Sequence, residues 1–378
     1  MSGEVEPAGR AEGHAARPVS GPTTLPFGPQ HPVLPEPLHF DLTLEDEKVV
    51  GVVPQIGYIH RGLELLIDKR DFPDYVHVAE RICGICSFMH GMGYCEAVES
   101  IFATVVPDRA RWLRTFWCEL ERIQSHLLWL GLAADAFGFE NLFMASWRAR
   151  ELVVDVAEET AGGRVIFGSA LVGGVSRDPG DETLRRCVLA MRPARAETLR
   201  LAEVMVKEPT VRHRLEGVGV LTKAEAYDLG AVGPMLRASG HDYDVRARGY
   251  AAYAEVDWKP VVETAGDSMA RALVRIREIE ESFAILDRLV AGMPAGPIAA
   301  TVRGMPPAGE AWIRLEQPRG EVLYYVRSNG TRQLERFRVR TPTFANIPAM
   351  VAAFKGSSLA DVPTIALTID PCISCTER

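Results

Sequence analysis

The stretch DRARWLRTFWCELERIQSHLLWLGLAADAF, residues 108–137, decides the fold that we expect for this chain. Its apolar residues recur at alternating spacings of three and four, which places their side chains on one face of an α-helix. We therefore predict a single long helix with a continuous apolar stripe. The stripe consists of Leu113, Phe116, Leu120, Ile123, Leu127, Leu130 and Ala134.

Similar helical patterns occur at 142–161, 181–207 and 262–291, and the last is rich in Glu and Arg on its outer face. Long amphipathic helices bury their apolar stripes by packing side by side. We expect a bundle at the centre of the molecule.

Two segments predict small β elements at the edges of this bundle. LHFDLTLEDEKVVGVV (38–53) alternates apolar and polar residues around an acidic turn, which is typical of a β-hairpin whose first strand begins just after Glu36. AWIRLEQPRGEVLYYVRSNG (311–330) predicts alternating strands interrupted at PRG and SNG. The predicted fold class is α+β, mainly α.

The chain shows no internal repeat and no linker that would separate two autonomous domains, so we expect a single domain over 23–378. Residues 1–22 are small, polar and rich in Pro and Gly. Such a segment cannot offset the entropy lost on folding. We expect a tail that is disordered or bound to a partner.

Composition excludes several classes of protein. Lys+Arg 42 against Asp+Glu 50 gives a net charge of −8, which argues against binding nucleic-acid phosphates. No stretch approaches the roughly 18 consecutive apolar residues of a spanning helix, and no signal peptide opens the chain. Any membrane attachment is therefore expected to come through partners.

Four of the seven cysteines form two C-x-x-C pairs near opposite ends of the chain. Cys83 and Cys86 lie in RICGICSFMH, and Cys372 and Cys375 lie in DPCISC. Together they can offer four thiolates to soft metals. The other three, Cys95, Cys118 and Cys187, have no regular spacing, and we expect ordinary buried thiols there.

The separation of the two pairs argues against a structural zinc module. Residues 83 and 372 are 289 positions apart, whereas zinc ribbons and fingers hold their pairs about 12–20 residues apart. A chain with 47% hydrophobic residues can also build its own core without a metal. The pattern favours a catalytic metal site.

The motifs R-x-C-G-x-C-x-x-x-H (81–90) and D-P-C-x-x-C (370–375) resemble the two signatures of the large, catalytic subunit of [NiFe] hydrogenases. PFGPQHP (26–32) and GYIHRGLE (57–64) resemble the membrane-bound, energy-converting (group 4) branch. That branch is related to the quinone-site (49 kDa) subunit of respiratory complex I. The resemblance runs from about residue 22 to the last residue.

This resemblance implies a NiFe(CO)(CN)2 centre, with Cys83 and Cys372 as terminal nickel ligands and Cys86 and Cys375 bridging nickel to iron. The implied reaction is the reversible reduction of protons to H2. The chain has too few cysteines to hold an iron–sulfur cluster as well, because a cubane needs about four thiolates of its own.

The resemblance also implies roles around the centre. His90, one helical turn after Cys86, would hydrogen-bond a cysteine sulfur. Glu36, in HPVLPEPLHF, corresponds to the glutamate that exchanges protons with the thiolate matching Cys372; a carboxylate at this point can relay the proton released when H2 is split.

Arg319, in QPRGEV, corresponds to an arginine that the family suspends over the open metal position. Pro318 would shape the same wall, and Asp135 corresponds to an acidic residue that fixes this arginine.

The C-terminus departs from the family pattern. Many hydrogenases have a histidine three residues after the last cysteine, and it helps bind magnesium together with a glutamate that matches Glu64. Here this residue is Arg378, and a cation cannot ligate a cation. We predict that Arg378 pairs with Glu64 in place of magnesium. Since no C-terminal peptide follows Arg378, we expect either a mature form or maturation without cleavage.

The partners implied by the family are a small iron–sulfur subunit with a proximal [4Fe-4S] cluster, a ferredoxin-like subunit and ion-translocating membrane subunits. The implied location is peripheral, on the cytoplasmic side of the membrane.

Two alternatives remain open at this point. One is a complex I-like quinone-reductase or structural subunit without nickel, and the other is a zinc-stabilised scaffold protein. Metal analysis distinguishes all three hypotheses.

Overall fold

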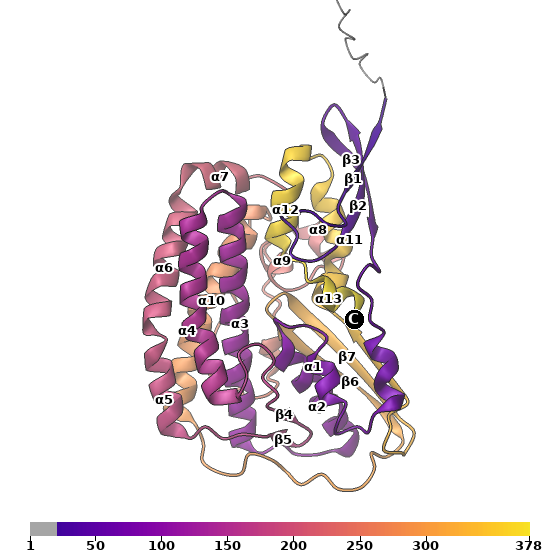
Figure 1. Cartoon of the computed structure of the whole chain (residues 1–378), viewed down its shortest axis with the longest axis vertical. Coiled ribbons are helices and arrows are strands. Elements are labelled where there is room, and N and C mark those ends of the chain that lie inside the picture. Colours follow the sequence, from indigo (N-terminus) through magenta and orange to yellow (C-terminus); the bar gives the residue numbers. More distant parts are fainter. Residues whose placement is uncertain (1–20) are drawn as a thin grey trace, which may run out of the picture.

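The computed structural model describes residues 21–378, so the tail predicted over 1–22 lies almost entirely outside the described residues. Helix α3, Asp108–Ala136, is the long helix that the apolar stripe predicts. It packs against α4 (Glu140–Ala161) and α10 (Ser268–Gly292), and α4 packs in turn against α6 (Arg192–Lys207). Figure 1 shows these helices side by side as one half of the molecule. The predicted bundle is confirmed.

The segment 181–207 forms two helices where the sequence pattern predicts one. Helix α5 spans Asp181–Ala190, and α6 begins at Arg192. Pro193 lies in the first turn of α6. A proline has no N–H to donate and its ring clashes with the carbonyl four residues earlier, so a helix cannot continue through it without a kink. The prediction of a single helix was wrong for this reason.

Two three-stranded antiparallel sheets lie beside the bundle (Figure 1). The predicted hairpin is β2 (His39–Glu45) with β3 (Lys48–Gln55), and β1 (Thr23–Phe27) adds an unforeseen edge strand. The second sheet contains β6 (Gly309–Gln317), β7 (Gly320–Ser328) and β8 (Arg336–Arg340), with the predicted interruption at Pro318 and Arg319. A two-stranded sheet, β4 (Ala170–Leu171) and β5 (Gly174–Val175), completes the β structure described here.

The remaining helices connect the bundle to the sheets. They are α1 (Val76–Glu80), α2 (Ser87–Phe102), α7 (Pro209–Leu215), α8 (Lys223–Asp228), α9 (Pro234–Arg237), α11 (Pro342–Phe354), α12 (Val362–Ile369) and α13 (Ile373–Glu377), with 3-10 turns η1 (Leu63–Lys69), η2 (Val245–Arg248) and η3 (Leu359–Asp361). Among the helices of residues 21–378, none is long and apolar enough to cross a membrane. The fold is α+β and mainly α, as predicted.

One hydrophobic core joins both ends of the chain. Residues of α2, α3, α10 and the β6–β8 sheet contribute to it, and so do all four cysteines of the two C-x-x-C pairs. The other three cysteines are buried as well, as expected. The two motifs are therefore neighbours in space although they are far apart in sequence.

Candidate metal centre

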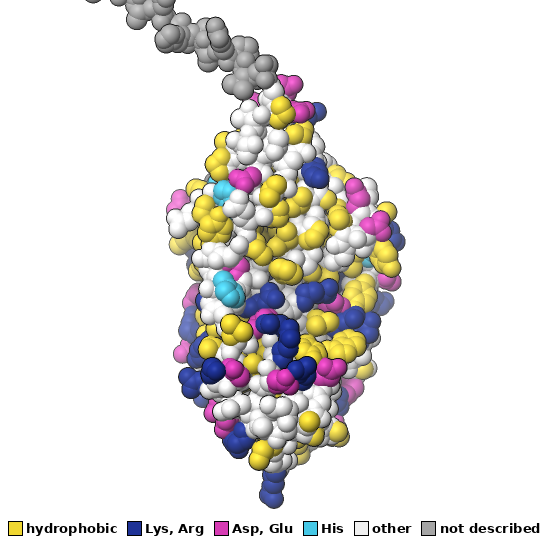
Figure 2. Space-filling model, turned by 90° about the vertical axis from the view of Figure 1, so that its right-hand side faces the viewer, with side chains coloured by type: hydrophobic (Ala, Val, Ile, Leu, Met, Phe, Trp, Pro, Cys, Tyr) yellow, Lys and Arg dark blue, Asp and Glu magenta, His cyan; other side chains and the backbone are white. Residues whose placement is uncertain are grey.

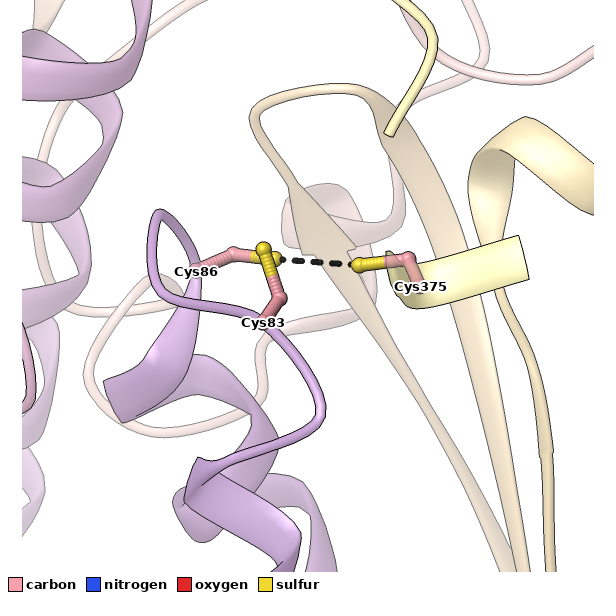
Figure 3. A group of neighbouring side chains, drawn as sticks. All are labelled: Cys83, Cys86 and Cys375. Carbon is pink, nitrogen blue, oxygen red and sulfur yellow. Dashed lines mark hydrogen bonds between the residues drawn. The ribbon is translucent and has the colours of Figure 1, made fainter. Parts of the chain in front are cut away.

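The four motif cysteines face one another between the loop that precedes α2 and the short helix α13. Cys83 Sγ lies 3.4 Å from Cys372 Sγ, and Cys86 Sγ lies 3.6 Å from Cys375 Sγ. Figure 3 shows Cys83 and Cys86 pointing from their loop toward Cys375. All four side chains are buried and none forms a disulfide. Each of these two sulfur contacts joins a cysteine of the first C-x-x-C pair to a cysteine of the second.

The backbone around each motif fixes the directions of these side chains. α12 ends at Ile369, and the next residue, Asp370, has a left-handed conformation with φ of 59°, a geometry that Asp tolerates better than most residues. The chain then turns at Pro371, and Cys372 caps α13 by accepting the N–H of Cys375. The Cys372 N–H is itself bonded to Thr343 Oγ1, at 3.0 Å.

Burial and crowding oppose full deprotonation of the four thiols. Hydrogen bonding from Cys372 holds the pKa of Cys83 well below its ordinary value, with a smaller contribution from the charge of Arg319. Burial raises the pKa of Cys86 and of Cys375 well above the ordinary value. A soft cation that binds here would displace the remaining protons, because thiolates are the ligand form of cysteine. The donor set therefore fits nickel and iron, and also zinc.

His90, on the first turns of α2, contacts the centre as the motif predicts. Its Nε2 lies 3.4 Å from Cys375 Sγ, and its Nδ1 lies 2.8 Å from the hydroxyl of Tyr324. Gln317 donates its amide N–H to the same hydroxyl oxygen, so the tyrosine proton is free to bond Nδ1. Burial lowers the pKa of His90 to about 4, so the ring is neutral at pH 7. A Tyr324 proton donated to Nδ1 would leave the ring proton on Nε2, toward the sulfur.

Gly93 makes room for this arrangement. A Cβ at Gly93 would lie 2.3 Å from Cε2 of Tyr324, inside van der Waals contact. The absence of a side chain one turn after His90 thus lets the Tyr324 ring reach the histidine.

Glu36 lies next to Cys372, in the loop that precedes β2. Its Oε2 accepts the N–H groups of Ile373 and Ser374, the two residues that follow Cys372. The hydrogen bond from Cys375 lowers the pKa of Cys372, but the Cys83 thiol, burial and the Glu36 carboxylate together raise it well above the ordinary value. The structure thus places Glu36 against the backbone directly after Cys372, and its exchange of protons with the thiol stays a prediction.

Arg319 occupies the tight turn between β6 and β7, and this turn packs closely against the chain before α9. A Cβ at Gly233 would lie 2.2 Å from Cα of Gly320, so both positions require glycine. Burial alone would lower the pKa of Arg319, but the charges of Asp370 and of the surrounding cysteines outweigh it, and the net pKa lies well above its ordinary value. The guanidinium therefore stays charged beside the cysteines.

The carboxylate that fixes Arg319 is Asp370, and the expectation for Asp135 was wrong. Arg319 donates to Oδ1 and to the backbone carbonyl of Asp370, both at 2.9 Å, and to Ser125 Oγ at 3.1 Å. Asp135 lies exposed in the last turn of α3. The DPC motif thus supplies both a cysteine and the counter-ion of the arginine.

Sequence reasoning missed Glu121, Gln124 and Ser125, three buried residues of α3 that contact the cysteine motif or Arg319. An amphipathic helix ordinarily turns the polar residues outside its apolar stripe toward solvent. Two large apolar residues that lie outside the stripe, Trp117 and Trp129, indicate instead that this helix is buried on all sides.

Glu64 and Arg378 form the predicted ion pair. Arg378 Nε donates to Glu64 Oε1 at 2.8 Å, and the second carboxylate oxygen accepts from Arg338. Burial would raise the pKa of Glu64, but these partners and the N–H of Val339 lower it below its ordinary value. The pairing is confirmed, and the exclusion of magnesium stays a prediction.

The chain matches two families. Residues 137–305 and 300–378 match the family described as the 49 Kd subunit of respiratory-chain NADH dehydrogenase, and residues 61–134 match the nickel-dependent hydrogenases. The chain belongs to the family that unites the large subunits of membrane-bound, energy-converting [NiFe] hydrogenases with the 49 kDa subunit of complex I.

Individual relatives cover nearly the whole chain. The carbon monoxide-induced hydrogenase of Rhodospirillum rubrum is 39% identical over 94% of this chain and 99% of that protein. The membrane-bound hydrogenase subunit alpha of Pyrococcus furiosus is 37% identical over 94% of this chain and 87% of its own length. Among solved structures, a chain of the membrane-bound sulfane sulfur reductase, an archaeal respiratory membrane complex, superimposes with a TM-score of 0.89 at 31% identity, covering 96% of this chain and 100% of that chain.

Proposed function

We propose that this protein is the catalytic subunit of a [NiFe] hydrogenase that interconverts H2 with two protons and two electrons. The observation that carries the proposal is the convergence of four buried thiols from opposite ends of the chain, with His90, Glu36 and Arg319 around them. A structural zinc site has no use for a buried arginine and a carboxylate beside its sulfurs.

Cys83 and Cys372 would bind nickel terminally, and Cys86 and Cys375 would bridge nickel and iron. The sulfur contacts at 3.4 and 3.6 Å each join one residue of each motif, which suits a centre shared between the motifs. When bound, the NiFe(CO)(CN)2 group supplies the two-electron chemistry of H2.

The surrounding residues handle charge and protons. The Glu36 carboxylate accepts the backbone N–H groups that follow Cys372. From this position it can pass a proton between the Cys372 thiol and the Pro-rich loop that carries Glu36. Arg319 keeps a fixed positive charge beside the cysteines and, held by Asp370, cannot itself swing in as a ligand. His90 donates to Cys375 and so lowers the electron density on that sulfur.

Electrons require a partner, because the described cysteines leave no set for a cluster. We propose a small iron–sulfur subunit with a proximal [4Fe-4S] cluster, a ferredoxin-like subunit and ion-translocating membrane subunits, with this chain peripheral on the cytoplasmic side. Figure 2 shows apolar side chains gathered on one face above a band of basic ones. Ile56 and Phe344 line a hollow of about 240 Å³ beside Arg378, close to the cysteine segment, and a partner would cover it.

The test is to purify the complex from cells that possess the hydrogenase maturation machinery and to measure metals, infrared bands of the diatomic ligands and D2/H+ exchange. We expect nickel and iron near one each per chain, with CO and CN bands. Glu36→Gln should abolish exchange while the bands persist, because the amide cannot carry the proton. Glu45→Gln, an exposed position at the end of β2, is the matched control and should keep full exchange.

Zinc, or no metal and no bands, would contradict the proposal. The nickel-free alternatives would then be the complex I-like subunit and, given the structural neighbour, a subunit of a sulfur reductase. Reduction of a quinone or of a sulfane sulfur by the same complex would distinguish these two.

A further inference from the structure

One turn of α3 contacts the segments that carry the candidate centre. Glu121, Gln124 and Ser125 project from the same side of the helix, because they are three and four residues apart, and all are buried. Gln124 donates to the carbonyl of Ile85, between the first two cysteines, at 3.1 Å. Ser125 accepts from Arg319.

Glu121 makes the most extensive of these contacts. Helix α2 begins at Ser87, directly after Cys86, and the N–H groups of its first turn have no partners within the helix. Cys86 provides no side-chain cap. Glu121 Oε1 instead accepts the N–H of Phe88 at 2.7 Å, and Oε2 accepts the N–H of Met89 at 2.9 Å. A carboxylate from another helix thus takes the role of the N-cap.

We infer that Glu121 is a positioning residue that fixes the Cys83–Cys86 segment for metal binding. Both oxygens of its carboxyl group accept a backbone N–H although burial raises the pKa of Glu121 well above its ordinary value, whereas the amide of a glutamine would offer one acceptor oxygen. The partial positive charge of the α2 N-terminus favours an acceptor of this kind. Because Cys86 immediately precedes the capped turn, a loosened turn moves its sulfur relative to that of Cys375.

The neighbouring side chains support this arrangement. Ser87 Oγ donates to the carbonyl of Val165 at 2.7 Å and lies 3.4 Å from Glu121 Oε1. Gln124 is held in turn by Arg150, whose NH2 donates to its Oε1 at 2.9 Å. The positioning is therefore built from α3 and α4, which pack against each other in the bundle.

The inference rests on the proposed function for the identity of the metal, whereas the contact itself does not depend on it. The experiment compares the wild type, Glu121→Gln and Glu121→Ala in the complete complex from maturation-competent cells. Amide hydrogen exchange of peptides spanning 83–95 is measured together with nickel content and thermal stability. We expect Glu121→Ala to exchange about 10-fold faster in this segment, the factor for loss of an ordinary helix cap, and to lose nickel. Glu121→Gln should lie between it and the wild type.

Ser146→Ala is the control, because it removes a buried hydrogen bond between α4 and the carbonyl of Leu127 without touching the cysteine segment. It should lower the melting temperature and leave exchange of 83–95 unchanged. A lower melting temperature with unchanged exchange of 83–95 in Glu121→Ala would overturn the inference. If the alanine variant fails to fold, wild-type exchange and wild-type metal content in Glu121→Gln would overturn it. A wild type without nickel would defeat the proposed function, while the exchange rates would still decide the role of Glu121.

Discussion

Gly93→Ala tests the packing that orients His90. The added methyl would lie 2.3 Å from Cε2 and 2.7 Å from both Cδ2 and Cζ of Tyr324, so the ring must recede by about 1 Å to reach ordinary contact distance. The ring has little freedom to do so, because it stacks on Phe337 and meets the edge of His90. The 2.8 Å bond between Tyr324 and His90 Nδ1 would then be lost or strained.

Two opposing effects determine the sign of the stability change. Alanine is favoured over glycine within a helix by about 1 kcal/mol. Overpacking of a buried site costs about 1–3 kcal/mol, and the broken hydrogen bond adds about 1 kcal/mol. We therefore expect Gly93→Ala to lower the free energy of unfolding by about 1–3 kcal/mol.

Urea unfolding of the purified protein measures this change, and a second background separates the clash from other causes. In a Tyr324→Leu background the ring is gone, so Gly93→Ala should become neutral or stabilising. Gly309→Ala, at a position where a Cβ meets nothing within 4 Å, should stay near wild type. A Gly93→Ala protein as stable as the wild type, or an equal loss in the Leu background, would refute the reasoning.

Three further predictions follow from the same geometry. Burial raises the pKa of Glu80 to about 7, so it contributes stability that is present below about pH 4.5 and lost as the pH rises through 7. Glu80→Gln should match the wild type near pH 4 and exceed it by up to about 3 kcal/mol at pH 8 in urea unfolding, and parallel pH curves would contradict this. Tyr324→Phe removes the hydroxyl that bonds His90 Nδ1. We expect a shift of the infrared bands of the loaded enzyme and a loss of about 1 kcal/mol in the free energy of unfolding. Unchanged bands would show that the hydroxyl does not determine the His90 tautomer. Because Arg378 holds Glu64, added Mg2+ should leave the melting temperature of the wild type unchanged, and a divalent ion found between these two residues in a crystal would prove this wrong.

The sequence predicted the parts of the fold that depend on local periodicity. The stripe from Leu113 to Ala134 gave α3 almost to the residue, and alternation gave β2–β3 and β6–β7. It failed where one residue overrides the pattern, as Pro193 does between α5 and α6. Strand β1 was missed because its sequence, TTLPF, is short and is defined by pairing with β2.

The candidate site was predictable for residues whose chemistry is carried by a motif. The spacing of the cysteines indicates soft-metal ligands, and the structure brings them together. The counter-ion of Arg319 was not predictable in this way, because several acidic residues could reach a given arginine and only the three-dimensional arrangement selects Asp370 over Asp135. Glu121 was hidden for a similar reason, since its partners are backbone N–H groups that leave no pattern in the sequence.

The buried polar face of α3 follows from charge balance. Glu119 and Arg122 of this helix are fully buried, which is favourable only where ions are paired. Their partners form one set of ion pairs, in which three arginines meet four carboxylates: Arg122, Arg237 and Arg246 with Glu119, Asp244, Glu278 and Glu316. A second, separate set beside the cysteines joins Arg275 and Arg319 through Asp370. Asp370 is shared between Arg319 and Arg275 of α10, so the bundle holds the charge beside the thiols through Arg275. Pairing of this kind explains how the charged residues of α3 can be buried in the interior.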